Sequence, residues 1–69
     1  MNIKHITTEI NILPDGRMRV NDAAAYLGLR PKTLAFMRTM NYGPKYFKLG
    51  YIFYFKDDLD AWIASGESQ

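Results

Sequence analysis

The chain has no cysteine and a single histidine, His5, among its 69 residues. Without cysteine no disulfide can cross-link the fold, and small domains in oxidising compartments usually depend on one. A structural zinc site is disfavoured for the same reason, because its ligands are normally cysteine and histidine. These absences favour a reducing, cytoplasmic setting and a domain that is stabilised by its own apolar core.

Long apolar runs are also missing. No stretch reaches the length that spans a bilayer, and the first residues lack the apolar core of a signal peptide. The sequence offers no nucleophile–base pair and no glycine-rich phosphate loop. A chain of about 60 residues buries only about 60% of its unfolded surface, which leaves little room for an enclosed catalytic pocket. We therefore expect a single non-enzymatic domain with no cofactor, no metal, no membrane partner and no small-molecule substrate.

Acidic side chains are scarce in the middle of the chain. Residues 17–56 contain eight basic side chains and one acidic one, Asp22, so this segment carries +7 although the whole chain carries only +2. The calculated pI is about 9.0. A compact positive block in a small domain is typical of a protein that binds a polyanion.

Residues 1–16 have a pattern of their own. Alternate positions are apolar or β-branched, which is typical of a strand with one covered face: Ile6, Thr8, Ile10 and Ile12. Pro14-Asp15-Gly16 indicates a turn, and residues 18–20 are suited to a returning strand. The pattern predicts either a short N-terminal hairpin or a loose arm.

Two short helices are predicted next. Asn21 suits the N-cap of a helix over about 21–27, and Gly28 suits its left-handed C-cap. Pro31 suits the first position of a second helix that runs to about residue 40. Helical spacing predicts a core-facing set of Ala23, Ala24, Leu27, Leu34 and Met37.

A β-hairpin is predicted over residues 45–49 and 52–56. Gly50-Tyr51 would form its two-residue turn, because glycine at the first central position suits a type II′ turn. Half of the residues from 42 to 55 are aromatic. Polarity does not alternate along Ile52-Phe53-Tyr54-Phe55, so the pattern does not show which face turns inward.

A third helix is predicted to open at Asp57-Asp58. Asp57 can cap it, with Asp60 in a capping-box position, and acidic groups suit the positive end of a helix rather than a metal site here. The expected core residues are Leu59, Trp62 and Ile63. Gly66 is the predicted C-cap. The chain thus divides into an arm or short hairpin over 1–16, a domain over 17–65 and a tail over 66–69.

The order of these motifs resembles a known family. The stretches that carry the likeness are Asp22-Ala23-Ala24-Ala25-Tyr26-Leu27-Gly28-Leu29, Thr33-Leu34, Gly43-Pro44, Lys48-Leu49-Gly50 and Asp58-Leu59-Asp60-Ala61-Trp62-Ile63. They are similar to the winged-helix DNA-binding domains of the MerR-like superfamily, above all to small AlpA-like regulators and phage excisionases. The resemblance covers about residues 18–64. It implies an α+β fold, a small winged helix-turn-helix with two short helices, a β-hairpin wing and a C-terminal helix.

The resemblance also implies a function. Such proteins bind double-stranded DNA in a bacterial host, as excisionases (recombination directionality factors), as transcriptional regulators of a phage or mobile element, or as both. An integrase or further copies of the chain are the protein partners this implies. The expected location is the cytoplasm, at the nucleoid when DNA is bound.

The charge block and the second helix supply candidate contacts. Residues expected near base edges in the major groove are Lys32, Thr33 and Phe36. Those expected near phosphates are Arg19, Arg30, Arg38, Lys45, Lys48 and Lys56. A structural role stays open for most of them. Lys32 and Thr33 would instead form a solvated first turn, and Phe36 would pack against Tyr42 or the N-terminal segment. Arg38 would pair with an acid of the third helix, and the lysines of the hairpin, Lys45, Lys48 and Lys56, would simply solvate a strand edge.

Two other functions remain open at this stage. The aromatic hairpin has few arginines and suits a protein-interaction or self-association module, which would show an exposed apolar patch. A phage packaging adaptor is the other alternative, since similar small winged helices occur there. Neither alternative requires an enzyme.

Overall fold

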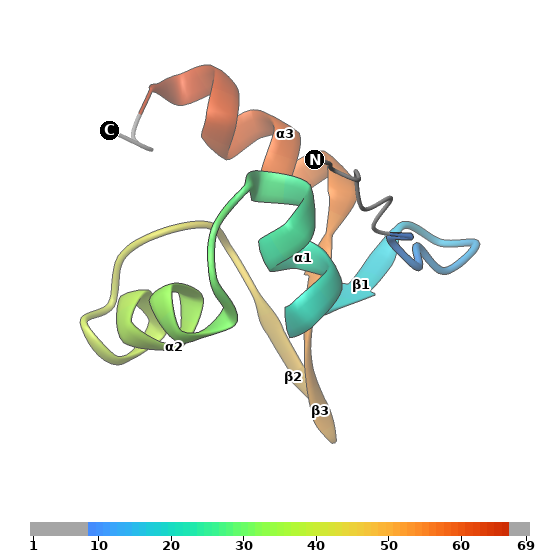
Figure 1. Ribbon diagram of the computed structural model, residues 1–69, viewed down its shortest axis with the longest axis horizontal. Coiled ribbons are helices and arrows are strands. Elements are labelled where there is room, and N and C mark those ends of the chain that lie inside the picture. The colour runs from blue at the N-terminus through green and yellow to red at the C-terminus, as the bar shows by residue number, and fades with distance from the viewer. Residues whose placement is uncertain (1–8, 67–69) are drawn as a thin grey trace, which may run out of the picture.

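A computed structural model describes residues 9–66 and shows a small α+β domain (Figure 1). Within these residues, three helices accompany a three-stranded antiparallel sheet. The elements in chain order are β1 (Arg17–Arg19), α1 (Val20–Leu27), α2 (Pro31–Thr39), β2 (Phe47–Leu49), β3 (Tyr51–Phe55) and α3 (Lys56–Ser65). The predicted α+β class is confirmed at this level. None of the described helices combines the length and apolar character needed to cross a bilayer.

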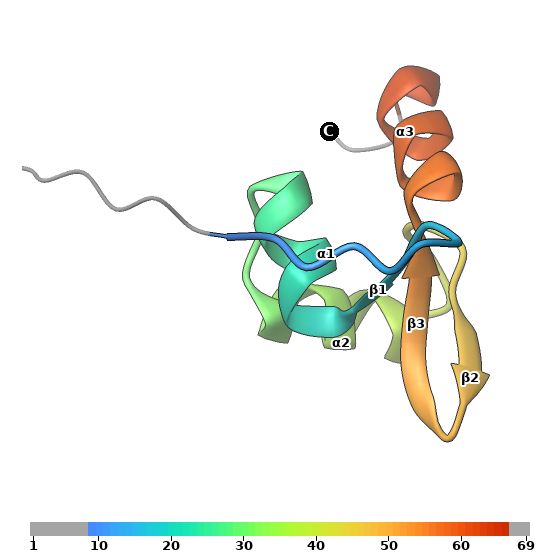
Figure 2. The same cartoon turned by 90° about the vertical axis from the view of Figure 1, so that its right-hand side faces the viewer.

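The sheet has the strand order β1-β3-β2, so the longest strand is central. Met18 of β1 lies opposite Tyr54, and Phe47 of β2 lies opposite Phe53. Helices α1 and α2 lie on one side of the sheet, and α3 continues beyond the end of β3 (Figure 2). Strand residues alternate between the two faces. The face toward the helices therefore carries Ile52 and Tyr54, which answers the question that the sequence left open.

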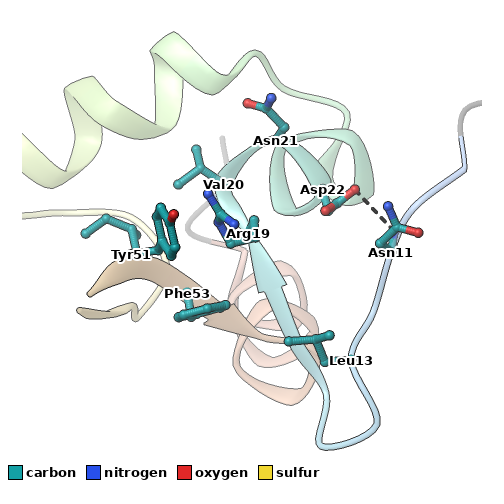
Figure 3. A pocket seen from close by; sticks show the side chains of 9 residues that line it. Asn11, Leu13, Arg19, Val20, Asn21, Asp22, Tyr51 and Phe53 are labelled. Carbon is teal, nitrogen blue, oxygen red and sulfur yellow. Dashed lines mark hydrogen bonds between the residues drawn. The ribbon is translucent and has the colours of Figure 1, made fainter. Parts of the chain in front are cut away.

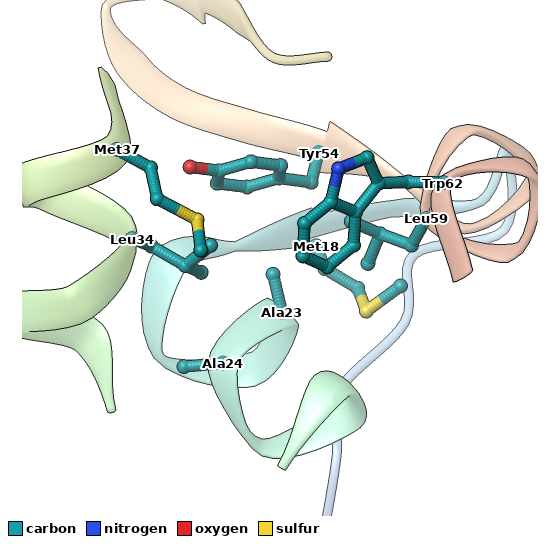
Figure 4. Packing of buried hydrophobic residues seen from close by; sticks show 8 residues of the cluster. All are labelled: Met18, Ala23, Ala24, Leu34, Met37, Tyr54, Leu59 and Trp62. Carbon is teal, nitrogen blue, oxygen red and sulfur yellow. The ribbon is translucent and has the colours of Figure 1, made fainter. Parts of the chain in front are cut away.

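The core lies between this inner sheet face and the helices (Figure 4). Its cluster of buried residues comprises Met18, Ala23, Ala24, Leu34, Met37, Tyr54, Leu59 and Trp62. The small side chains of the two alanines allow α1 to approach the rest of the cluster closely. The core positions predicted for the second helix are confirmed. Leu27 is only partly buried, at the edge of the cluster.

Ile63 is a correction to the predicted core. Its side chain is 46% exposed, whereas Leu59 and Trp62 on the same helix are buried. Helix α3 projects past the end of the sheet (Figure 2), and only one narrow side of it meets the other elements. The apolar spacing correctly predicts a helix, but it overestimates the width of the covered face.

The two predicted aspartate and asparagine N-caps are wrong. Helix α1 begins at Val20 after an extended Arg19, and α3 begins at Lys56 after an extended Phe55. No side chain caps the N-terminus of either helix with a hydrogen bond. Each strand passes directly into the next helix, so no loop residue is available to cap it. The left-handed C-caps are confirmed, with φ of 74° at Gly28 and 78° at Gly66.

The hairpin has a different register from the predicted one. Leu49 lies opposite Tyr51, so Gly50 alone forms the apex, with a φ of 77° that favours glycine. This register places Phe47 and Phe55 on the outer face with their ring centroids 5.3 Å apart. The ring centroids of Tyr46 and the buried Tyr54 lie 6.1 Å apart. This register is stabilised by cross-strand aromatic packing, which the local turn sequence does not reveal.

The N-terminal hairpin is not present in the described part of the chain. Residues 9–16 form no strand, and β1 pairs with β3 instead. The predicted turn at Pro14-Asp15 is present, since the Gly16 amide donates to the Leu13 carbonyl at 2.8 Å. The Gly16 carbonyl in turn accepts a bond from the Lys56 amide at 2.8 Å. Ile6 and Thr8 lie outside the described residues.

Candidate nucleic-acid interface

Helix α2 and the tip of the β2–β3 hairpin project to the same side of the molecule, while α3 lies at the opposite end (Figures 1 and 2). Leu34 and Met37 anchor the inner side of α2 in the core. The outer side carries exposed side chains four residues apart, namely Lys32, Phe36 and, just after the helix ends, Met40. Phe36 and Met40 are each 56% exposed, so Phe36 is not buried among residues 9–66; the part of the N-terminal segment before residue 9 lies outside the described residues. An accessible helix therefore stands next to an accessible hairpin.

The start of α2 is the most cationic part of this surface. Arg30 precedes the helix in an extended conformation, and Pro31 occupies its first turn. Both Arg30 and Lys32 are exposed, and neither forms an ion pair with any residue between 9 and 66. Thr33 is half-buried and donates its backbone N–H to the Arg30 carbonyl at 3.0 Å. Two charges are thus available to an incoming anion at the helix N-terminus, where the dipole is also positive.

The hairpin adds a cation on the side facing the helices. Lys48 lies opposite Ile52, and both share the inner sheet face, so the Lys48 side chain extends on the same side as α2. It is exposed because it lies closer to the tip than the covered Tyr54 position. Lys48 therefore adds a positive charge near the hairpin tip, on the sheet face that carries the helices.

Arg19 lies on the other face of the hairpin. Its guanidinium carbon is 3.6 Å from the centroid of the Tyr51 ring, a close cation–π stack. The pair borders an open groove of about 680 Å³ between the hairpin and the start of α1 (Figure 3). Asn21 and Asp22 form the α1 side of that groove, and Asp22 accepts a hydrogen bond from the Asn11 amide at 3.2 Å.

Arg38 and Lys45 lie away from the hairpin tip. Arg38 donates a hydrogen bond of 2.7 Å to the Tyr54 hydroxyl and also lies 5.8 Å from the Tyr46 ring centroid, so it joins α2 to the sheet. Burial raises the pKa of Tyr54, while the Arg38 bond acts in the opposite direction. The predicted alternative of an acidic partner is not realised among the described residues. Lys45 lies 5.3 Å from the Phe47 ring centroid, before β2 begins.

Lys56 lies at the opposite end of the molecule from the hairpin tip. Its ammonium group forms an ion pair of 2.9 Å with Asp60, one helical turn along α3. The Tyr26 hydroxyl donates a further hydrogen bond to the same carboxylate and so ties α1 to α3. The structure thus separates Lys56 from the other candidate phosphate contacts.

The Asp60 cluster predicts how stability depends on pH. The bond from Tyr26 and then that from Lys56 lower the pKa of Asp60. Asp60 therefore contributes stability above its unfolded pKa of about 4, and the contribution is lost as pH falls through the folded value. We expect the thermal midpoint of the wild type to fall in this acidic window and that of Asp60→Asn to change less there. Parallel pH dependences in a thermal melt series would contradict this.

Four of the six acidic side chains in residues 9–66 lie at or beside α3, whereas Asp22 borders the groove next to Arg19. Asp57, Asp58 and Asp60 lie on α3, and Asp15 lies on the turn beside the start of that helix. The end opposite α3 carries Arg30, Lys32, Lys48 and Arg19. Among residues 9–66, no group of three His, Cys, Asp or Glu side chains is placed to hold a metal ion.

Three residues of this surface were missed by sequence reasoning. Leu49 and Tyr51 lie side by side at the hairpin tip, and Asn21 borders the groove. The sequence pattern predicts a helix cap at Asn21, a strand position at Leu49 and a turn position at Tyr51. For Leu49 and Tyr51, the position next to the hairpin apex was the one signal of exposure, because a large apolar side chain there has no core within reach.

Comparison with known proteins gives no family for this chain. No family model matches it, and no curated protein matches it.

Proposed function

We propose that this protein is a winged helix-turn-helix that binds double-stranded DNA. In this proposal α1 and α2 are the helix-turn-helix, the β2–β3 hairpin is the wing, and α2 is the recognition helix. One observation carries the proposal: an exposed helix, with Arg30 and Lys32 at its start unpaired within residues 9–66, projects to the same side as a cationic hairpin tip, and the acidic groups of α3 lie at the other end. Such a charge distribution orients the protein on a polyanion before any specific contact forms.

Recognition would begin with α2 in the major groove, where each base pair presents a distinct pattern of donors, acceptors and methyl groups. Lys32 and Thr33 are in the first turn of α2, the part of a recognition helix that approaches base edges. Phe36, one turn further, offers an apolar surface suited to a thymine methyl group. The contacts that determine sequence preference are therefore proposed to lie within two helical turns.

Phosphate contacts would fix the protein in register. Arg30 immediately precedes α2, Lys48 lies on the helix-facing side of the hairpin, and Arg19 lies on the other face. Arg38 and Lys45 are nearer to the body of the domain and stay in the proposed set as peripheral contacts. Lys56 leaves this set, because its ammonium group is paired with Asp60 on α3, at the end of the molecule opposite the hairpin tip.

The biological setting rests on the sequence resemblance. We propose an excisionase or a transcriptional regulator of a phage or mobile element, acting on DNA in a bacterial cytoplasm. An integrase gene beside the coding sequence would favour excision, and an excision assay with that integrase would then test the role directly.

Salt dependence tests the DNA-binding proposal. With about five phosphate contacts, the logarithm of affinity should fall with the logarithm of salt concentration with a slope of about −4.5. Fluorescence anisotropy with a labelled duplex measures the slope. Lys48→Ala should reduce its magnitude by about 0.9 and weaken binding to all sequences alike, whereas Lys56→Ala should leave it unchanged. A flat salt response would contradict the proposal.

A further inference from the structure

The tip of the hairpin is the most exposed apolar feature of the described surface. Leu49 is 57% exposed and Tyr51 is 61% exposed, and the two lie opposite each other on either side of Gly50. Both side chains point to the outer sheet face, away from the core. A short strand pair that ends in two uncovered apolar side chains forms a narrow wedge rather than a broad docking face.

The wedge is supported from behind by Arg19. The guanidinium stacks on one face of the Tyr51 ring at 3.6 Å, which restricts the ring and brings a positive charge to the tip (Figure 3). Lys48 adds a second positive charge from the opposite face of the hairpin. The hairpin itself contains no acidic residue. The tip therefore combines apolar bulk with cations on both sides.

From this combination we infer that the hairpin tip inserts Leu49 into the minor groove of duplex DNA and partly unstacks one base step. This inference rests on the proposed function and extends it to the hairpin. Side chains that wedge between base pairs from the minor groove are apolar, and arginines or lysines beside them meet the groove's negative potential. Tyr51 would press on the adjacent sugar or base, held in place by Arg19.

The position of the tip agrees with this assignment. The tip and α2 project to the same side of the molecule, so a duplex that holds α2 in its major groove presents its backbone and the neighbouring minor groove to the hairpin (Figures 1 and 2). Charge complementarity favours DNA over a second protein as the occupant, because Arg19 and Lys48 flank the apolar pair. Among the described residues, Asp22 is the one acid that borders the adjacent groove, and it accepts a hydrogen bond from the Asn11 amide on the α1 side.

The inference gives the hairpin a role in sequence choice. Opening a base step costs free energy, and this cost is lowest at pyrimidine–purine steps such as TA and CA. The protein would thus prefer a flexible step at a fixed distance from the bases that α2 contacts, without any hydrogen bond to that step.

The test measures unstacking separately from binding. The probe is a duplex that the wild-type protein selects from a random pool, with 2-aminopurine in place of each adenine in turn; its fluorescence rises when stacking is lost. We expect a rise at one step with the wild type and with Leu49→Met, and no rise with Leu49→Ala. The exposed Ile63 on α3 provides the control, since Ile63→Ala should behave as the wild type. The salt slope of Leu49→Ala should equal that of the wild type, because no phosphate contact is removed.

The outcomes separate the two proposals. If the wild type binds the duplex but no 2-aminopurine brightens, or if Leu49→Ala brightens it equally, the wedge is overturned and DNA binding stands. If Leu49→Ala converts a self-associated wild type to monomer in DNA-free sedimentation, the tip is a protein interface and the wedge is overturned. If the pool yields no bound duplex, both proposals fall together.

Discussion

Lys32→Glu should abolish sequence-selective DNA binding and reduce total affinity by about 100-fold. Lys32 is exposed in the first turn of α2 and forms no ion pair within residues 9–66. The substitution removes a proposed base contact and places a carboxylate against the DNA phosphates. The lost contact and the charge repulsion both lower the affinity. Because the side chain is exposed, folding should be unaffected, which circular dichroism would verify. Anisotropy with the selected duplex and with an unrelated duplex measures the effect.

The matched control for this variant is Lys56→Glu. It makes the same change of charge at the end of the molecule opposite the hairpin tip, so it should reduce affinity far less. Equal losses from both variants would show that net charge, and not the placement of α2, governs binding. The milder Lys32→Ala should relax base preference more than it lowers affinity.

Leu59→Ala should lower the free energy of unfolding by about 3 kcal/mol. Leu59 is fully buried and packs in the same cluster as Met18 and Trp62, where it holds α3 against the sheet. A domain of this size has a small stability margin, so such a loss should leave a substantial unfolded fraction at 37 °C. Urea denaturation followed by tryptophan fluorescence measures the change, since Trp62 is the only tryptophan.

Ile63→Ala on the same helix is the reference for this prediction. The Ile63 side chain is nearly half exposed, so its truncation should cost well under 1 kcal/mol. Equal shifts of the urea midpoint for the two substitutions would contradict the assignment of Leu59 to the core and of Ile63 to the surface. The residual DNA affinity of Leu59→Ala should track its folded fraction, because Leu59 is far from the proposed contacts.

Local sequence signals predicted the parts of the fold that local chemistry decides. Gly28 ends α1 in a left-handed conformation and Pro31 opens α2, as expected from the intrinsic preferences of these residues. The spacing of Leu34 and Met37 identified the buried side of α2. These features depend on neighbours within one or two turns of chain, so a pattern in the sequence is sufficient to find them.

Features set by distant contacts were not predictable in the same way. The hairpin register depends on which aromatic rings meet across the strands, and the turn residues alone suggested a different pairing. The partner of Arg38 is the hydroxyl of Tyr54, sixteen residues away, and not an acid. For Lys56 a local signal did exist, because Asp60 lies at the i,i+4 spacing that favours helical ion pairs.

The candidate surface was therefore only partly visible in the sequence. The residues of α2 could be named because helix position alone determines their exposure. The division of the remaining cations between the two faces of the hairpin and the opposite end required the register and the strand order.

The direct passage from strand to helix has a mechanical consequence. Arg19 ends β1 and immediately precedes α1, while Phe55 ends β3 and immediately precedes α3. The Lys56 amide at the second junction also donates to the Gly16 carbonyl in the turn before β1. No flexible joint therefore separates the hairpin from α3. A molecule bound to α3 would therefore keep a fixed orientation relative to a molecule bound at the hairpin.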